Sequence, residues 1–152
     1  MLPKDNELLE TASELLARIH VPGRHEVAAV LRTRSGALHT GIHLEGSARR
    51  SSICAEGIAL GAAFTAEDRE IETILAVHYK PAGVLRVIAP CGVCRELLYD
   101  YCPDAHVYVY EPAPGELPDG TVPGAGPVSA PPGGVARVTV ADLLPSKTRR
   151  RW

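Results

Sequence analysis

The apolar residues near the start of the chain recur at helical spacing. In residues 5–20 they fall three or four positions apart, which is typical of an amphipathic helix. The pattern is made by Leu8, Leu9, Ala12, Leu15, Leu16 and Ile19. Asp5 and Asn6 precede it and predict a polar cap, and Val21-Pro22-Gly23 predicts the end of the helix.

Several later segments have the composition of β-strands. Residues 26–33 and 38–45 flank an Arg34-Ser35-Gly36 turn, which predicts a β-hairpin. Further strands are predicted at residues 74–79, 84–89, 106–110 and 135–140.

Two more helices are predicted between the strands. An Ala-rich helix at residues 54–66 has Cys54 and Glu56 on its first turn, and another runs from the Cys91–Cys94 pair to Tyr101. Strands alternating with helices predict an α/β domain, with one sheet flanked by helices on both faces. The Pro/Gly-rich residues 112–134 predict a long surface loop.

Length and charge narrow the class of protein. The 152 residues suit one domain. The formal net charge of -2 gives no general attraction to nucleic acid or acidic membranes. The N-terminus lacks the apolar core of a signal peptide and no apolar run would span a bilayer, so we expect a cytoplasmic protein. In that compartment cysteines serve metal or redox chemistry more often than disulfides.

Two short motifs carry the candidate chemistry, Cys54-Ala55-Glu56 and Pro90-Cys91-Gly92-Val93-Cys94. Helix N-termini lower thiol pKa values, so Cys54, Cys91 and Cys94 are credible zinc ligands there. Three protein ligands leave one tetrahedral position of Zn²⁺ open, which is typical of catalytic zinc. Cys102, at the far end of its helix, is expected to be too distant to join them.

Glu56 starts from the same helical turn as Cys54 but points elsewhere, which suits a proton shuttle better than a ligand. A non-ligand Glu beside a water-activating zinc is the arrangement of zinc deaminases. The alternative is a structural zinc site closed by a histidine, with Glu56 as a solvated carboxylate. A redox role for the Cys91–Cys94 pair would leave Cys54 and Glu56 without a function.

These motifs resemble those of the cytidine deaminase family, which has Cys-Ala-Glu followed by Pro-Cys-Gly-x-Cys-Arg. The resemblance extends to Leu143-Leu144-Pro145 and covers almost the whole chain. It implies a three-layer α/β/α sandwich with a five-stranded mixed sheet, zinc held by the three cysteines, Glu56 as shuttle, and a homotetramer or dimer. It also implies that the Ala55 backbone contacts the substrate.

The resemblance has departures at the expected substrate contacts. The ribose-binding Gly-x-Asn-x-Glu segment corresponds to residues 41–45, in which Glu45 is kept and His43 replaces the asparagine. His25 stands where relatives have a pocket phenylalanine, and Gly57 where they have an arginine, for which Arg49, Arg50 or Arg95 are candidate replacements. The substrate is therefore a cytidine-like nucleoside or, alternatively, a substituted cytosine such as blasticidin S.

The basic C-terminal residues 147–152 are a solvated terminus or, by hypothesis, contact an anionic part of the substrate. The tyrosines have no basic residues interleaved with them, so a polynucleotide substrate is not expected. A non-catalytic zinc-stabilised module is the remaining alternative.

Overall fold

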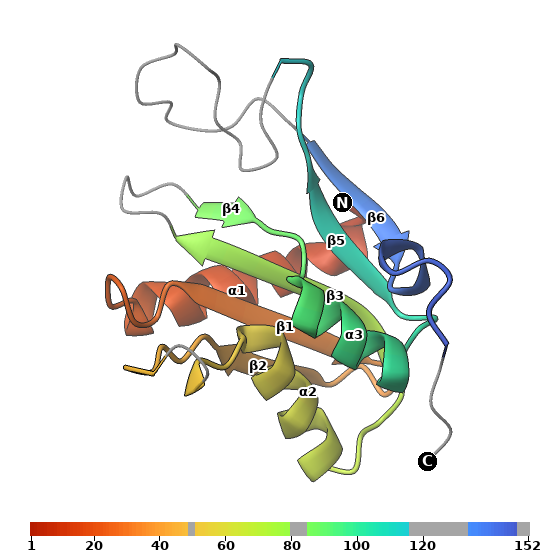
Figure 1. The fold of residues 1–152 in the computed structure, drawn as a ribbon, viewed down its shortest axis with the longest axis horizontal. Helices are drawn as coiled ribbons and strands as arrows, with labels where there is room; N and C mark the ends of the chain where they lie inside the picture. The colour runs from red at the N-terminus through yellow and green to blue at the C-terminus, as the bar shows by residue number, and fades with distance from the viewer. Residues whose placement is uncertain (49–50, 80–84, 116–133, 149–152) are drawn as a thin grey trace.

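The computed structural model describes residues 1–48, 51–79, 85–115 and 134–148 (Figure 1). The predicted helices and strands all appear, with shifted ends. In chain order they are η1 (Pro3–Asp5), α1 (Asn6–Ile19), β1 (Val27–Thr33), β2 (Leu38–Ile42), α2 (Ala55–Thr65), β3 (Ile71–Tyr79), β4 (Leu85–Val87), α3 (Gly92–Tyr101), β5 (His106–Glu111), β6 (Gly134–Thr139) and η3 (Ala141–Leu143). Most of the predicted loop at 112–134 lies outside the described residues.

The strands form one mixed sheet in the order β2-β1-β3-β5-β6. β3 and β5 are parallel, and the other neighbouring pairs are antiparallel. β1 occupies one edge of β3 along its length, so β4 and β5 share the other edge. The predicted five-stranded sheet is thus confirmed as the main path, with the short β4 as an additional sixth strand.

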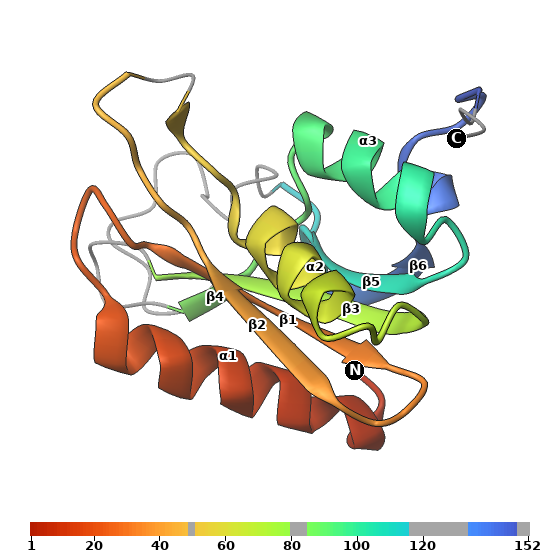
Figure 2. The same ribbon diagram turned by 90° about the horizontal axis from the view of Figure 1, so that it is seen from below.

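Alternating residues of the central strands pack against helices on opposite faces of the sheet. Ala28 and Val30 of β1 belong to the core cluster with α1, whereas Ala29 and Leu31 belong to the cluster with α2 and α3. Because successive side chains of a strand point to opposite faces, a buried strand can serve two cores. Figure 2 shows the resulting layers, with α1 below the sheet and α2 and α3 above it.

A close approach at Gly41 determines where α2 begins. A Cβ atom on Gly41 would collide with the carbonyl of Ala55 and lie 2.5 Å from the backbone nitrogen of Ala59. Only glycine lets the first turns of α2 lie this close to β2. The glycine therefore brings the Cys54 motif against the end of the hairpin.

The chain between β2 and α2 departs from the predicted strand at residues 38–45. β2 ends at Ile42, and Leu44 forms an isolated antiparallel bridge with Ile53. The backbone N–H of His43 still donates to the carbonyl of Val27 at 2.9 Å. This segment therefore leaves the sheet after Ile42 and is held against it at His43.

Candidate active site

Two helix starts bring the predicted zinc ligands together. Cys54 is the N-cap of α2 with extended backbone, rather than part of the helix as predicted, and Cys91 is the N-cap of α3. Cys94 lies on the first turn of α3 and is buried. Both helices cover the same face of the sheet (Figure 1), so the three thiols meet above it.

The sulfur geometry suits a tetrahedral metal ion. The Sγ atoms of Cys54 and Cys91 are 3.5 Å apart, and all three Sγ atoms lie within 4.8 Å of one another. Two sulfurs bound to zinc at 2.3 Å and tetrahedral angles would be about 3.8 Å apart. The donor set therefore fits Zn²⁺, and among the described residues no fourth His, Asp or Glu joins this cluster.

The prediction that helix N-termini lower the pKa of all three thiols is wrong for two of them. Burial, followed by the hydrogen bond with Cys91, raises the pKa of Cys54 to about 11. Burial, followed by repulsion from Glu56, also raises the pKa of Cys94. Burial acts in the same direction on Cys91, but hydrogen bonds from Cys94 and Cys54 lower its pKa overall. Desolvation is the largest cause at both Cys54 and Cys94.

Glu56 is the second residue of α2, and its side chain is almost completely buried, with 4% of the residue exposed. Burial raises the pKa of its carboxyl group, while its own backbone N–H, the Cys94 thiol and His43 act in the opposite direction. A carboxyl group with a raised pKa can hold a proton as well as release one.

A pocket of about 220 Å³ opens beside the three cysteines. Its lining consists of Val27, His43, Cys54, Ala55, Glu56, Ile88, Ala89 and Cys91. Sequence reasoning missed Val27, Ile88 and Ala89, although Ile88 and Ala89 directly precede the Pro90 motif. The pocket is smaller than the about 300–1,000 Å³ of typical drug-binding sites, which suits a single small ring.

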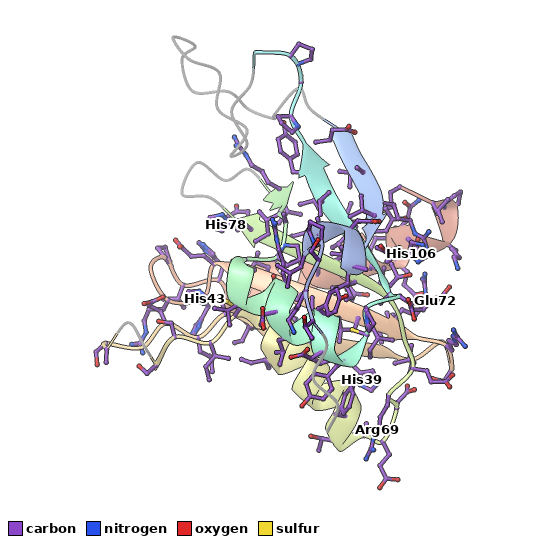
Figure 3. All side chains as sticks on the ribbon, turned by 45° about the vertical axis from the view of Figure 1, so that its right-hand side comes forward. His39, His43, Arg69, Glu72, His78 and His106 are labelled. Carbon is purple, nitrogen blue, oxygen red and sulfur yellow. The ribbon has the colours of Figure 1, made fainter. Side chains whose placement is uncertain are left out.

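The structure brings two of the four predicted substrate residues, His43 and Ala55, to the pocket wall. Glu45 lies behind His43, with its Oε2 atom 3.0 Å from the His43 Nε2 atom. His25 does not line the pocket, and its Nδ1 atom lies 3.0 Å from the carbonyl oxygen of His43. Figure 3 labels His43 beside the start of α3.

Arg95 contacts backbone carbonyl groups, one of them directly before Cys91, rather than the sulfur atoms. Its Nε atom donates to the carbonyl of Pro90 at 2.9 Å, and its Nη1 atom donates to the carbonyl of Leu143 at 3.4 Å. A Cβ atom on Gly57 would meet only Leu97, at 3.6 Å, so space does not explain the glycine there. Arg49 and Arg50 lie outside the described residues.

The remaining candidates lie away from the pocket. Cys102 is buried in the core at the end of α3, as a core thiol. The ammonium group of Lys147 lies 2.6 Å from Asp100 and 3.3 Å from Glu96, both on α3. The charge of Lys147 is thus paired within its own chain. Residues 149–152 lie outside the described part of the chain.

The fold and the sulfur cluster together define a zinc deaminase domain, and comparisons with known proteins agree. Residues 2–110 match the family described as "Cytidine and deoxycytidylate deaminase zinc-binding region". The chain belongs to this family.

Individual relatives fall in the same class. The chain is 36% identical over 110 residues to blasticidin-S deaminase of Bacillus cereus, which covers 70% of this chain and 79% of the relative. It is 29% identical over 140 residues to a cytidine deaminase of Halalkalibacterium halodurans, and the match covers 91% of this chain and 89% of the relative. The crystal structure of cytidine deaminase from Burkholderia pseudomallei superimposes with a TM-score of 0.69 at 25% identity, covering 97% of this chain and all of that one. The predicted fold class and family are confirmed.

Among the described residues, no helix has the length and apolarity needed to cross a membrane.

Proposed function

We propose that the protein is a hydrolase that removes the exocyclic amino group of a cytosine nucleoside and releases ammonia. Water supplies the new carbonyl oxygen, so the products are the corresponding uracil compound and ammonia. The observation that carries the proposal is the buried Glu56 carboxyl group beside three sulfur donors, two of which line the same pocket as Glu56.

The residues divide this work between them. Cys54, Cys91 and Cys94 would hold Zn²⁺, which supplies Lewis acidity and lowers the pKa of a coordinated water molecule. Glu56 would accept the proton of the attacking water and deliver protons to the ring nitrogen and the departing amino group. Its raised pKa, caused mainly by burial, suits a group that alternates between these two states.

The pocket wall would orient the ring. Val27, Ile88 and Ala89 offer apolar contact, and the Ala55 backbone at the start of α2 offers polar groups to the base. His43 also lines the pocket and would contact the substituent on the ring. We keep Glu45 and His25 in the proposed substrate-binding set as residues that hold His43, since each lies 3.0 Å from an atom of His43 and neither lines the pocket.

A Glu56→Ala variant tests the proposal. The zinc-loaded variant should retain about one zinc per chain and its melting temperature, but lose ammonia release by at least about a hundredfold, as expected for an acid–base group. The assignment would be refuted if the wild-type protein deaminated none of the cytosine nucleosides, or if the variant kept full activity. In a structural zinc module, none of these measured properties would depend on Glu56.

A substituted cytosine nucleoside is the second candidate substrate. It is favoured by the 36% identity to blasticidin-S deaminase. Ammonia release should be compared on cytidine, 2′-deoxycytidine and blasticidin S with one enzyme preparation. Activity confined to blasticidin S would favour the substituted cytosine nucleoside as the substrate. Activity on all three compounds would favour cytosine nucleosides in general.

We further propose a cytoplasmic homo-oligomer, a tetramer or a dimer, built from a single domain of residues 1–152. Leu44, Ile53 and Val93 near the pocket are 39%, 49% and 75% exposed, and apolar side chains of this size favour contact with another chain. A cluster of three thiols also suits a reducing compartment. Light scattering should report the assembly, and Val93→Asp should reduce its mass.

A further inference from the structure

The backbone around Cys91 is held by one residue of α3. The Nε atom of Arg95 donates to the carbonyl of Pro90 at 2.9 Å, and the backbone N–H of Arg95 donates to the carbonyl of Cys91 at 2.9 Å. Cys91 itself is exposed, so burial does little to fix its position. Arg95 therefore binds the carbonyl groups on both sides of the Cys91 side chain.

The same guanidinium group reaches the C-terminal segment, residues 140–148. Its Nη1 atom donates to the carbonyl of Leu143 at 3.4 Å. The backbone N–H of Ala141 donates to the carbonyl of Pro103 at 3.0 Å, just after the end of α3. Figure 2 shows this segment, in blue, beside α3. Arg95 thus joins the chain before Cys91 to a segment about 50 residues later in the sequence.

Lys147 fixes the far end of the C-terminal segment on α3. Its Nζ atom lies 2.6 Å from Asp100, 3.3 Å from Glu96 and 5.3 Å from the ring centroid of Tyr99. The Tyr99 hydroxyl donates to the Lys147 carbonyl at 3.2 Å, and the Lys147 side chain is only 11% exposed. Ser146, directly before it, has a φ of 63°, which is unfavourable for a residue with a side chain and which these contacts offset.

We propose that the C-terminal segment stabilises the zinc site, with Arg95 and Lys147 as positioning residues for Cys91. Lys147 fixes the segment on α3, the segment presents the Leu143 carbonyl to Arg95, and Arg95 holds the Pro90 carbonyl next to the ligand. A ligand that is already held in place loses less conformational freedom when it binds a metal. Neither positioning residue lines the pocket. The inference rests on the proposed zinc site and adds residues that touch neither metal nor substrate.

The test is the affinity for zinc, measured by competition with a chromogenic chelator in the absence of substrate. Arg95→Met removes both side-chain hydrogen bonds, so the apparent dissociation constant of zinc should rise about 10- to 100-fold. Lys147→Met acts one step further from the ligand and should raise it about three- to tenfold. The second variant keeps the test decisive if the first does not fold. An unchanged dissociation constant in a folded variant overturns the positioning role of that residue.

A double variant tests whether the two residues act in series. If Lys147 acts through Arg95, then Arg95→Met with Lys147→Met should bind zinc no more weakly than Arg95→Met alone. A dissociation constant raised by the product of the two single effects would overturn this path.

Two controls separate positioning from a general loss of stability. Tyr108→Phe removes a hydrogen bond to Asp5 in the core cluster on the other face of the sheet, so it should lower the melting temperature and leave the zinc affinity unchanged. Lys4→Met is matched to Lys147→Met, because Lys4 also lies 2.6 Å from a carboxylate, that of Glu72. Equal rises in the zinc dissociation constant of the controls and the test variants would overturn the proposal.

The wild-type protein distinguishes this inference from the proposed function. If it binds no zinc, the proposed zinc site fails and this inference fails with it. If it binds zinc and folded Arg95→Met binds zinc equally tightly, only the role of the C-terminal segment is overturned.

Discussion

The phenol of Tyr108 donates a 2.6 Å hydrogen bond to the carboxylate of Asp5, 103 residues earlier in the chain. Asp5 is completely buried, and its other oxygen forms an ion pair with Arg32, whose side chain is 8% exposed. The backbone nitrogen of Leu2 in turn donates to the Tyr108 hydroxyl at 3.0 Å. This network fixes the start of the chain across β1 and β5.

Removal of the Asp5 carboxylate should therefore destabilise the protein strongly. Asp5→Ala removes the completely buried partner of Arg32, whose remaining contacts are Glu72 at 3.4 Å and the carbonyl of Lys4 at 2.7 Å. We therefore expect a loss of about 3–5 kcal/mol in the free energy of unfolding. Tyr108→Phe removes one hydrogen bond to a charged group and should cost about 1.5–3 kcal/mol. Urea unfolding of each variant measures both values.

The exposed pair between Lys4 and Glu72 provides the control for that series. Its Lys4 side chain is 55% exposed, so Lys4→Ala should cost at most about 1 kcal/mol. An Asp5→Ala variant no less stable than Lys4→Ala would contradict a structural role for the buried network.

The position of α2 depends on glycine at one point of β2. Gly41→Ala places a Cβ atom against the backbone of α2 and should cost at least about 1–3 kcal/mol, as other overpacked sites do. Gly61→Ala, in α2 with open space around the added atom, should instead stabilise by about 0.5–1 kcal/mol. Thermal and urea unfolding should show changes in stability of opposite sign for the two variants. Equal changes would show that the close approach of α2 to Gly41 does not require glycine.

Local sequence patterns predicted the elements and the sulfur cluster because both depend on short spacings. The strand at residues 74–79 was predicted three residues too short, since Ile71 and Thr73 are buried by pairing with β1 and β5 rather than by local pattern. Asp5 was expected to cap the first helix, yet its side chain makes no cap hydrogen bond and pairs with Arg32 instead.

The substrate-binding residues were harder to predict, because their positions depend on contacts that no local sequence pattern encodes. That Glu45 lies behind His43 depends on the path of the chain after Ile42, which follows from the Leu44–Ile53 bridge and the Ser52 hydrogen bond. These contacts join residues seven to nine positions apart in an irregular segment, where no periodic pattern applies. The pocket residues Val27 and Ile88 likewise meet only through the sheet.

Asp68 should contribute to stability in a pH-dependent manner. Hydrogen bonds from Thr33 and then His39 hold the pKa of its carboxyl group below the usual value. A depressed folded-state pKa means that the contribution is present above the unfolded-state pKa and is lost as the pH falls through the folded-state value. The wild-type protein should therefore lose stability on acidification below about pH 4 more steeply than Asp68→Asn. Unfolding midpoints measured from pH 6 to pH 2.5 test this, and parallel curves would contradict it.

The sulfur cluster makes the most direct prediction about metal content. Separate Cys54→Ala, Cys91→Ala and Cys94→Ala variants should each lose tightly bound zinc, because two remaining thiolates make a weaker site. The readout is zinc per chain by elemental analysis after dialysis against a chelator, which requires no substrate. Wild-type protein should retain about one zinc ion per chain under the same conditions.

Cys102→Ala is the matched control for these variants. Cys102 is buried in the core at the end of α3 and is not part of the cluster, so its removal creates a small cavity without removing a ligand. The variant should lose roughly 1 kcal/mol of stability and still retain zinc at the wild-type ratio. Because all four variants remove one thiol, a general loss of folding would lower the zinc content of all of them, whereas loss of a ligand separates the first three from the fourth. Zinc retained by Cys91→Ala, or lost by folded Cys102→Ala, would contradict the assignment of the three-sulfur site.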